Sequence, residues 1–239
     1  MNQENTSFLN KFKIPLFDVD WTLLKGGNPA HLDAFDFALK TVYKLPQHAS
    51  IKDHLTEGKI DPQILMEIAQ KFGVSENEAK EKVQDAMTAE VDYFMKHINE
   101  GHYEIMLGVI DLLEELNLLG IPIGLLTGNI EEIGWEKMRQ AGIRDYFTFG
   151  AFGSLAFKRA DLIPIAKQRL DKILNTKIPL QNFVIIGDSP LDIACARANN
   201  IQVITVASGV YKHHDLAHAD LVVKSLEEKD KIIEFLNLT

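Results

Sequence analysis

The sequence predicts an α/β fold, in which a Rossmann-like parallel sheet is split after its first strand by a helical insertion. Apolar runs of strand length, such as residues 14–17 and 183–186, alternate with helical patterns over the second half of the chain. This alternation is typical of a parallel sheet covered on both faces. Residues 29–100 instead show helical spacing throughout. With 239 residues, 46% of them hydrophobic, the chain can build a large core.

The inserted segment contains three predicted helices. The first spans about residues 29–42, where apolar side chains recur at helical spacing. Asp61 and Pro62 are typical of an N-cap and first turn, and they predict the start of the second helix. Ser75 and Glu78 have the spacing of a capping box and predict the start of the third.

From Gly108 onward the predicted elements alternate between helix and strand. In order, we expect a helix over 109–119, a strand over 121–126, a helix to about 141, a strand near 147–149, a helix over 161–174, a strand over 183–186, a helix around 191–194, strands over 203–206 and 221–223, and a last helix capped by Ser225 and Glu228.

Composition excludes some classes of function. The formal net charge is −9, so a general nucleic-acid surface, which needs clustered Lys and Arg, is not expected. Cys195 is the one cysteine, so the chain forms no internal disulfide, which suits a reducing cytoplasm. The polar residues 1–10 indicate no signal peptide, and no apolar run is long enough to span a membrane. We therefore expect a cytoplasmic protein with neither nucleic-acid nor membrane partners.

Polar clusters follow three of the predicted strands. Asp18 and Asp20 end the first strand, residues 127–129 (Thr-Gly-Asn) follow the second, and Asp188 and Asp192 follow the fourth. The carboxyl ends of parallel strands share one edge of the sheet, so these groups are expected to meet in one crevice. Clustered carboxylates repel one another unless a cation lies between them, and oxygen ligands suit Mg²⁺. The alternative for a lone Asp-x-Asp pair is two solvated acids in a loop.

These three motifs, in this order, resemble the haloacid dehalogenase-like hydrolase superfamily. The motifs are residues 18–23 (DVDWTL), 126–129 (LTGN) and 187–192 (GDSPLD). The resemblance covers nearly the whole chain after residue 13, and residues 58–61 with Ile64 and Leu65 resemble the helical cap of phosphoglycolate phosphatase-like members. It implies a core formed by residues 1–25 and 102–239, and a cap formed by residues 26–101. We expect hinges near Gly26-Gly27 and Gly101.

The resemblance also implies roles for individual residues. Asp18 is expected to be the nucleophile that forms an aspartyl-phosphate, and Asp20 to protonate the leaving oxygen and then activate water. Thr127 is expected to hold the phosphoryl oxygens, with help from the backbone near Gly128 and Asn129.

A magnesium ion is the cofactor that the resemblance implies. Its expected ligands are Asp18, the carbonyl of Asp20 and Asp188, and Asp192 either supports the ion or binds it directly.

Three further positions stay open at the level of sequence. The family's basic residue corresponds to Lys158 or Arg159, with Arg159 preferred. Lys59 is a candidate for substrate contact from the cap, or a solvated lysine at a helix start. Trp21 replaces the family's usual Gly, and because Trp tolerates positive φ poorly, we expect its backbone not to be left-handed and its indole to lie at the mouth of the site. A Trp that fills a gap between core and cap is the alternative.

The function that follows is Mg²⁺-dependent hydrolysis of a small phosphorylated metabolite, by a monomer or homodimer whose cap admits a small ester. Two alternatives remain: a signalling protein that accepts a phosphoryl group on an aspartate, and a catalytically silent binding protein of the same fold. Asp20 disfavours the first, since a phosphoacceptor needs no general acid.

Overall fold

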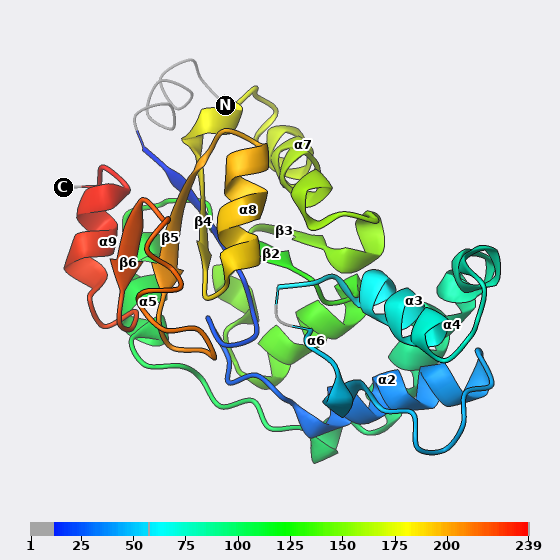
Figure 1. Cartoon of the computed structure of the whole chain (residues 1–239). Helices are drawn as coiled ribbons and strands as arrows, with labels where there is room; N and C mark the ends of the chain where they lie inside the picture. Colours follow the sequence, from blue (N-terminus) through cyan, green and yellow to red (C-terminus); the bar gives the residue numbers. More distant parts are fainter. Residues whose placement is uncertain (1–11, 57, 239) are drawn as a thin grey trace.

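A six-stranded parallel sheet forms the centre of the computed structural model, which describes residues 12–56 and 58–238 (Figure 1). The strand order is β3-β2-β1-β4-β5-β6. The strands are β1 (Ile14–Phe17), β2 (Gly124–Thr127), β3 (Phe149–Phe152), β4 (Phe183–Gly187), β5 (Gln202–Val206) and β6 (Leu221–Val223). The predicted Rossmann-like α/β class is confirmed. The amino-terminal residues 1–10, for which no signal peptide is expected, lie outside the described residues.

Helices cover both faces of the sheet. Leu16 and Phe17 point to opposite faces, as neighbours on a strand must, and belong to different hydrophobic clusters. The cluster around Phe17 includes side chains from α5, α6 and α9, and the cluster around Leu16 includes side chains from α7 and α8. These helices are α5 (Val109–Leu118), α6 (Glu131–Gln140), α7 (Leu162–Leu174), α8 (Pro190–Ala198) and α9 (Lys229–Phe235).

The topology has a switch point beside β1. From β1 the chain extends the sheet through β2 to β3, then crosses to the other side of β1 and continues through β4 to β6. At such a point the connections leave in opposite directions, which opens a crevice at the carboxyl ends of the strands. The strands β1, β2 and β4, which precede the three predicted motifs, are therefore adjacent, and their ends meet at this crevice.

Of the helices between β1 and β2 in the described chain, three pack together beside this edge of the sheet (Figure 1). They are α2 (Pro29–Thr41), α3 (Asp61–Lys71) and α4 (Glu76–Lys96). They share a hydrophobic cluster of their own, which also takes in Ile130 and Ile133 near the start of α6. The domain boundaries predicted at residues 26 and 101 stay predictions. Within the described residues, no helix is both long enough and apolar enough to cross a membrane.

Two of the predicted helix caps are wrong. Asp61 is the first residue of α3 rather than its N-cap, which is Ile60, because its carboxylate instead accepts a hydrogen bond from the backbone amide of Ile130 at 2.8 Å. Ser225 does not cap α9, whose N-cap is Glu228. The Ser225 hydroxyl donates to Glu227 instead, so the last helix starts later than expected.

Candidate active site

The turn after β1 places two carboxylates at the crevice. The amide of Asp18 donates to the carbonyl of Ile186 on β4 at 2.9 Å, which continues the sheet pairing for one residue. The amides of Leu23 and Leu24 both bond to the carbonyl of Val19, so the chain turns sharply just after the strand. As a result Asp18 is buried, and Asp20, two residues further on, is partly exposed.

A cavity of about 350 Å³ lies between this edge of the sheet and the helical insertion. Its volume is at the lower end of the range for small-molecule sites. Most of the predicted site residues line it, namely Asp18, Asp20, Trp21, Lys59, Thr127, Gly128, Asn129, Arg159 and Asp188. Asp192 and Lys158 are not among the residues that line this cavity.

Arg159, and not Lys158, reaches the carboxylate of Asp18. Its guanidinium lies 3.1 Å from Asp18 Oδ1 and 2.7 Å from Asp192 Oδ1, and it also donates to the carbonyl of Leu126 at 3.3 Å. Arg159 is only 8% exposed, whereas the neighbouring Lys158 is exposed. Of the two basic candidates, the structure brings only Arg159 to the site.

Asp18, Asp188 and Asp192 form a buried cluster that fits a metal ion. One carboxylate oxygen from each lies within 4.8 Å of the others. Oδ2 of Asp188 is buried with no hydrogen-bond partner among the described residues. Burial, together with Asp18 and Asp192, raises the pKa of Asp188 to about 9, and burial raises the pKa of Asp18 to about 7 against the opposing effect of Arg159. Three carboxylates this close together need a cation or protons between them. All the ligand atoms that they offer are oxygens, which Mg²⁺ prefers.

Asp192 is held by other groups. Its Oδ1 accepts from Arg159, and its Oδ2 accepts from the amide and the hydroxyl of Ser189 at 3.1 and 2.7 Å. These contacts form a capping box at the start of α8. With both oxygens engaged, Asp192 is better suited to support the cluster than to contribute a free ligand atom.

The loop after β2 approaches the inserted segment closely. A Cβ atom on Gly128 would lie 2.0 Å from the carbonyl oxygen of Lys59, so only glycine fits there. The amide of Asp61 donates to the carbonyl of Gly128 at 2.9 Å. Thr127 is buried, and its hydroxyl accepts from the amide of Asn129 at 3.2 Å. The loop therefore places the Thr127 hydroxyl in the cavity that the two aspartates also line.

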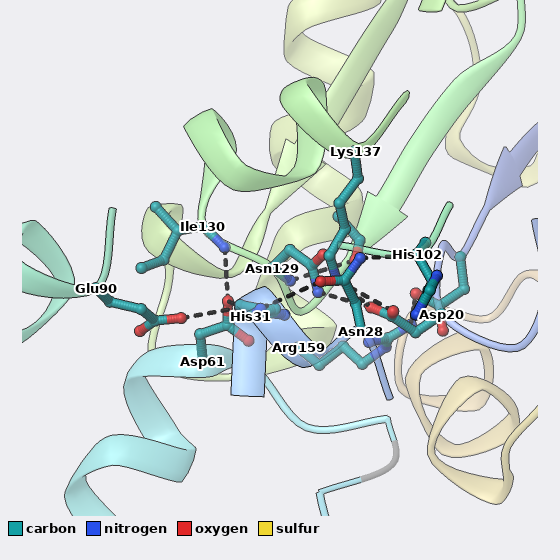
Figure 2. Close-up of polar contacts among 12 residues, drawn as sticks. Asp20, Asn28, His31, Asp61, Glu90, His102, Asn129, Ile130, Lys137 and Arg159 are labelled. Carbon is teal, nitrogen blue, oxygen red and sulfur yellow. Dashed lines mark hydrogen bonds and ion pairs between the residues drawn. The ribbon is translucent and has the colours of Figure 1, made fainter. Parts of the chain in front are cut away.

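Asp20 forms an ion pair with Lys137, a residue that the sequence did not indicate (Figure 2). Nζ of Lys137, on α6, lies 3.1 and 3.0 Å from the two carboxylate oxygens of Asp20, and Nδ2 of Asn129 donates to Oδ2 at 3.0 Å. Burial acts to raise the pKa of Asp20, but Lys137, with help from His31, holds it below its ordinary value.

Three buried ionisable residues meet at the wall of the cavity, which His31 and Asp61 line, and no pattern in the sequence indicates this cluster (Figure 2). Nε2 of His31 on α2 lies 3.0 Å from Oε1 of Glu90 on α4 and 3.5 Å from Oδ2 of Asp61 on α3. Burial, reinforced by Asp61, raises the pKa of Glu90 to about 7, and His31 opposes that shift. Each residue comes from a different helix, so no spacing along the chain marks the group.

The expectation for the Trp21 backbone is wrong. Its φ is 64°, in the left-handed region. The amide of Trp21 donates to the carbonyl of Leu24, and the carbonyl of Trp21 accepts from the Ser208 hydroxyl at 2.7 Å. A Cβ atom on Gly26 would lie 2.1 Å from the indole nitrogen, so the ring lies against the chain at Gly26. These contacts fix the turn despite the preference of the residue, and Trp21 lines the cavity as expected.

Comparison with known proteins gives relatives along most of the chain. The family model described as haloacid dehalogenase-like hydrolase matches residues 15–206. A protein of Chromobacterium violaceum named phosphoglycolate phosphatase is 27% identical over 215 residues, which cover 82% of this chain and 92% of that protein. A Neisseria meningitidis protein of the same name is 30% identical over 119 residues, 47% of this chain and 49% of its own.

Solved structures show the same fold. CbbY from Rhodobacter sphaeroides, determined in complex with phosphate, superposes with a TM-score of 0.65 at 21% identity, covering 91% of this chain and 96% of its own. A protein of Clostridium acetobutylicum described as a predicted phosphatase superposes with a TM-score of 0.68 at 22% identity, covering 94% and 99%. Because the family model spans most of the chain, from the Asp18 motif to the end of β5, this protein belongs to the haloacid dehalogenase-like hydrolase family.

Proposed function

We propose that this hydrolase is a magnesium-dependent phosphatase of small phosphate monoesters that works through an aspartyl-phosphate on Asp18. The observation that carries the proposal is the placement of Asp18. Its buried carboxylate lies beside Arg159 and the acidic cluster, at the floor of a cavity that Asp20 and Thr127 also line. Phosphoryl transfer depends mainly on such positioning and on neutralisation of charge.

The first half of the reaction transfers the phosphoryl group to the protein. A carboxylate oxygen of Asp18 attacks phosphorus, and the bond from phosphorus to the ester oxygen breaks. Asp20 gives its proton to that oxygen, so the alcohol leaves in neutral form. The Thr127 hydroxyl donates a hydrogen bond to a phosphoryl oxygen, and Arg159 steadies Asp18.

The second half returns the protein to its starting state. Asp20, now ionised, takes a proton from water, and the resulting hydroxide attacks phosphorus. The bond between phosphorus and the Asp18 oxygen breaks, which releases inorganic phosphate and restores the Asp18 carboxylate. The proton that Asp20 takes from water is the one it delivers to the next ester oxygen, and Asp20 carries it only briefly, because Lys137 favours the ionised carboxylate.

Asp18, the carbonyl of Asp20 and Asp188 are the groups that would hold Mg²⁺, supported by Asp192. The bound ion would supply positive charge against the phosphoryl oxygens. Asp188, with its unpartnered buried Oδ2, is the residue whose environment most needs a cation.

The substrate class follows from the cavity. Its size suits a small ester rather than a folded phosphoprotein. Lys52 and Lys59 line the cavity and pair with Asp33 and Glu67 at 3.5 and 2.6 Å, so a second anionic group on the substrate would compete with these carboxylates for the two ammonium groups. Phosphoglycolate is the first compound to test, since the relatives in Chromobacterium and Neisseria carry that name.

A panel of phosphorylated metabolites with Mg²⁺, read out as released phosphate, tests the function. We expect turnover of at least one small ester, abolished by a chelator and restored by Mg²⁺. Asp18→Asn keeps the shape of the side chain but removes the nucleophile, so it should remain folded and lose measurable turnover. Wild-type turnover in this variant, or hydrolysis confined to intact phosphoproteins, would contradict the proposal.

A further inference from the structure

Lys137 occupies a position on α6 where an apolar residue is expected. It lies four residues after Ile133 and next to Met138, and all three are buried on the same side of the helix. Its side chain is only 1% exposed. The exposed face of α6 carries the other basic residue of the last turn, Arg139, which pairs with Glu136. Burying an ammonium group is costly unless a charge compensates it, so Lys137 needs a specific partner.

The partner is the carboxylate of Asp20, 117 residues away in the chain (Figure 2). Nζ of Lys137 lies within 3.1 Å of both carboxylate oxygens. Asn129 adds a hydrogen bond at 3.0 Å to Oδ2 alone, so Lys137 is the partner that these contacts give to Oδ1. Asp20 lines the cavity, whereas Lys137 is not among its lining residues. The lysine therefore contacts Asp20 on the side that faces away from the space where an ester would bind.

This geometry limits where Asp20 can point. With Lys137 in place, the carboxylate is fixed at both oxygens and faces the cavity from one side. Without it, the bond from Asn129 would be the one hydrogen bond to this carboxylate left among the described residues, and the carboxylate could turn about its own side-chain bonds. Acid–base catalysis requires the proton-carrying group within hydrogen-bond reach of its target, so such rotation would weaken both steps that use Asp20.

We infer that Lys137 is a positioning residue that orients Asp20 for proton transfer. The inference rests on the proposed function, since it presumes that Asp20 is the acid and base of the reaction. Lys137 itself touches neither substrate nor metal in this scheme, and its effect passes through Asp20 alone. The role predicts a loss in turnover without a matching loss in substrate binding.

Lys137→Met is the main variant, because Met has a similar shape without the charge. We expect kcat on the best ester of the metabolite panel to fall roughly 10–100-fold, a part of the 10²–10⁴-fold that general acid–base catalysis commonly supplies. KM and the Mg²⁺ concentration for half-maximal rate should stay within about twofold. Arg139→Met, on the exposed face of the same helix, is the matched control and should leave kcat unchanged.

A double-mutant cycle with Asp20→Asn separates this role from a merely structural one. If Lys137 acts through Asp20, then Lys137→Met should cause no further loss of kcat in the Asp20→Asn background. A structural lysine would instead lower kcat by the same factor in both backgrounds. Circular dichroism and thermal melting establish that each variant is folded, and Lys137→Gln replaces the Met variant if the latter does not fold.

The outcomes distinguish this inference from the function on which it rests. If Asp20→Asn alone leaves kcat unchanged, the proposed acid–base role of Asp20 fails, and the inference fails with it. If Asp20→Asn lowers kcat while a folded Lys137→Met enzyme keeps wild-type kcat, the function stands and the inference is overturned. Equal losses from Lys137→Met in both backgrounds also overturn it. A loss seen only when Asp20 is present supports it.

Discussion

Trp21 shows how tertiary contacts can override the preference of a single residue. Left-handed backbone costs a side chain with a Cβ atom roughly 1–2 kcal/mol, and Trp21 adopts it with φ of 64°. Hydrogen bonds at its amide and carbonyl, to Leu24 and Ser208, hold the turn. The indole lies where any side chain on Gly26 would collide with it. The ring therefore occupies space beside Gly26, and Trp21 is one of the residues that line the cavity.

Two variants, Trp21→Gly and Trp21→Ala, separate the effect of the left-handed backbone on stability from the effect of the indole ring on substrate binding. Both variants lose the indole, so both should shift KM or substrate preference, by roughly 2–10-fold if the ring contacts the ester, and kcat by less. Only Gly relieves the left-handed strain, so its free energy of unfolding should exceed that of the Ala variant by roughly 1 kcal/mol.

Urea denaturation and steady-state kinetics measure these two effects, and isothermal titration with Mg²⁺ provides the control. Metal binding should stay intact in both variants. Lost Mg²⁺ binding in Trp21→Gly would mean that the turn itself depends on the tryptophan.

At the scale of elements, the His31–Asp61–Glu90 cluster joins α2, α3 and α4 by charged contacts. Asp61 also accepts from the amide of Ile130, just before α6, so the cluster links the insertion to the core. Burial and Lys137 act to lower the pKa of His31, but its bonds to Asp61 and Glu90 raise it above the ordinary value. Burial raises the pKa of Glu90 to about 7. The charges that face Glu90 are Asp61, His31 and Lys137.

The stability that this cluster contributes should fall as pH rises. A carboxyl whose pKa is raised on folding binds its proton more tightly in the folded state, so its contribution is full below its ordinary pKa of 4.5 and is lost as pH rises through about 7. The raised pKa of His31 acts in the same direction. Glu90→Gln removes the contribution of Glu90. The decrease in the free energy of unfolding between pH 4.5 and 7 should therefore be smaller in this variant than in wild type, by an amount on the order of 1–3 kcal/mol.

Urea denaturation of wild type and Glu90→Gln at several pH values measures the difference. Glu78→Gln is the matched control, since the Glu78 side chain is half-exposed on the same helix and, among the described residues, forms one ion pair, with Lys82. Parallel pH profiles for wild type and Glu90→Gln would contradict the account of the cluster.

The sequence predicts the strand-end motifs well and the contacts between elements poorly. Asp18 and Asp188 directly follow short apolar strands and Thr127 is the last residue of another, so local pattern and parallel topology place them together. His31 and Glu90 come from helices whose packing no spacing reveals. Lys137 left one signal, a lysine at an apolar helical position beside Ile133 and Met138, but its partner could not be read from the chain.

Element limits shift where tertiary pairing decides them. The strand predicted near residues 147–149 is β3, Phe149–Phe152, which pairs with β2 from Gly124 to Thr127. The strand predicted over 121–126 starts only at Gly124 for the same reason. The apolar residues before these strands, Ile121 and Phe147, are buried all the same, so hydrophobicity alone does not distinguish them from strand residues.

At the scale of the whole molecule, the two connections between sheet and insertion run side by side. The amide of Lys25 donates to the carbonyl of Glu104, and their side chains pair at 3.0 Å. Nδ2 of Asn28 donates to the carbonyl of His102 at 2.8 Å. These connections include Gly26-Gly27 and lie next to Gly101, where we predict the hinges on which the insertion closes over the cavity and excludes water.

The central claim, that Asp18 carries the phosphoryl group between two half-reactions, is tested most directly by trapping the intermediate. Asp20→Asn should form the aspartyl-phosphate from p-nitrophenyl phosphate, whose leaving group needs no proton, but hydrolyse it slowly. Acid quenching in the presence of Mg²⁺, followed by intact-mass and peptide mass spectrometry, should show one added phosphoryl group on the peptide that contains Asp18. The same peptide should be unmodified in the Asp18→Asn, Asp20→Asn double variant. Continued release of phosphate with no adduct on Asp18 at any time, or an adduct on another residue, would contradict the account.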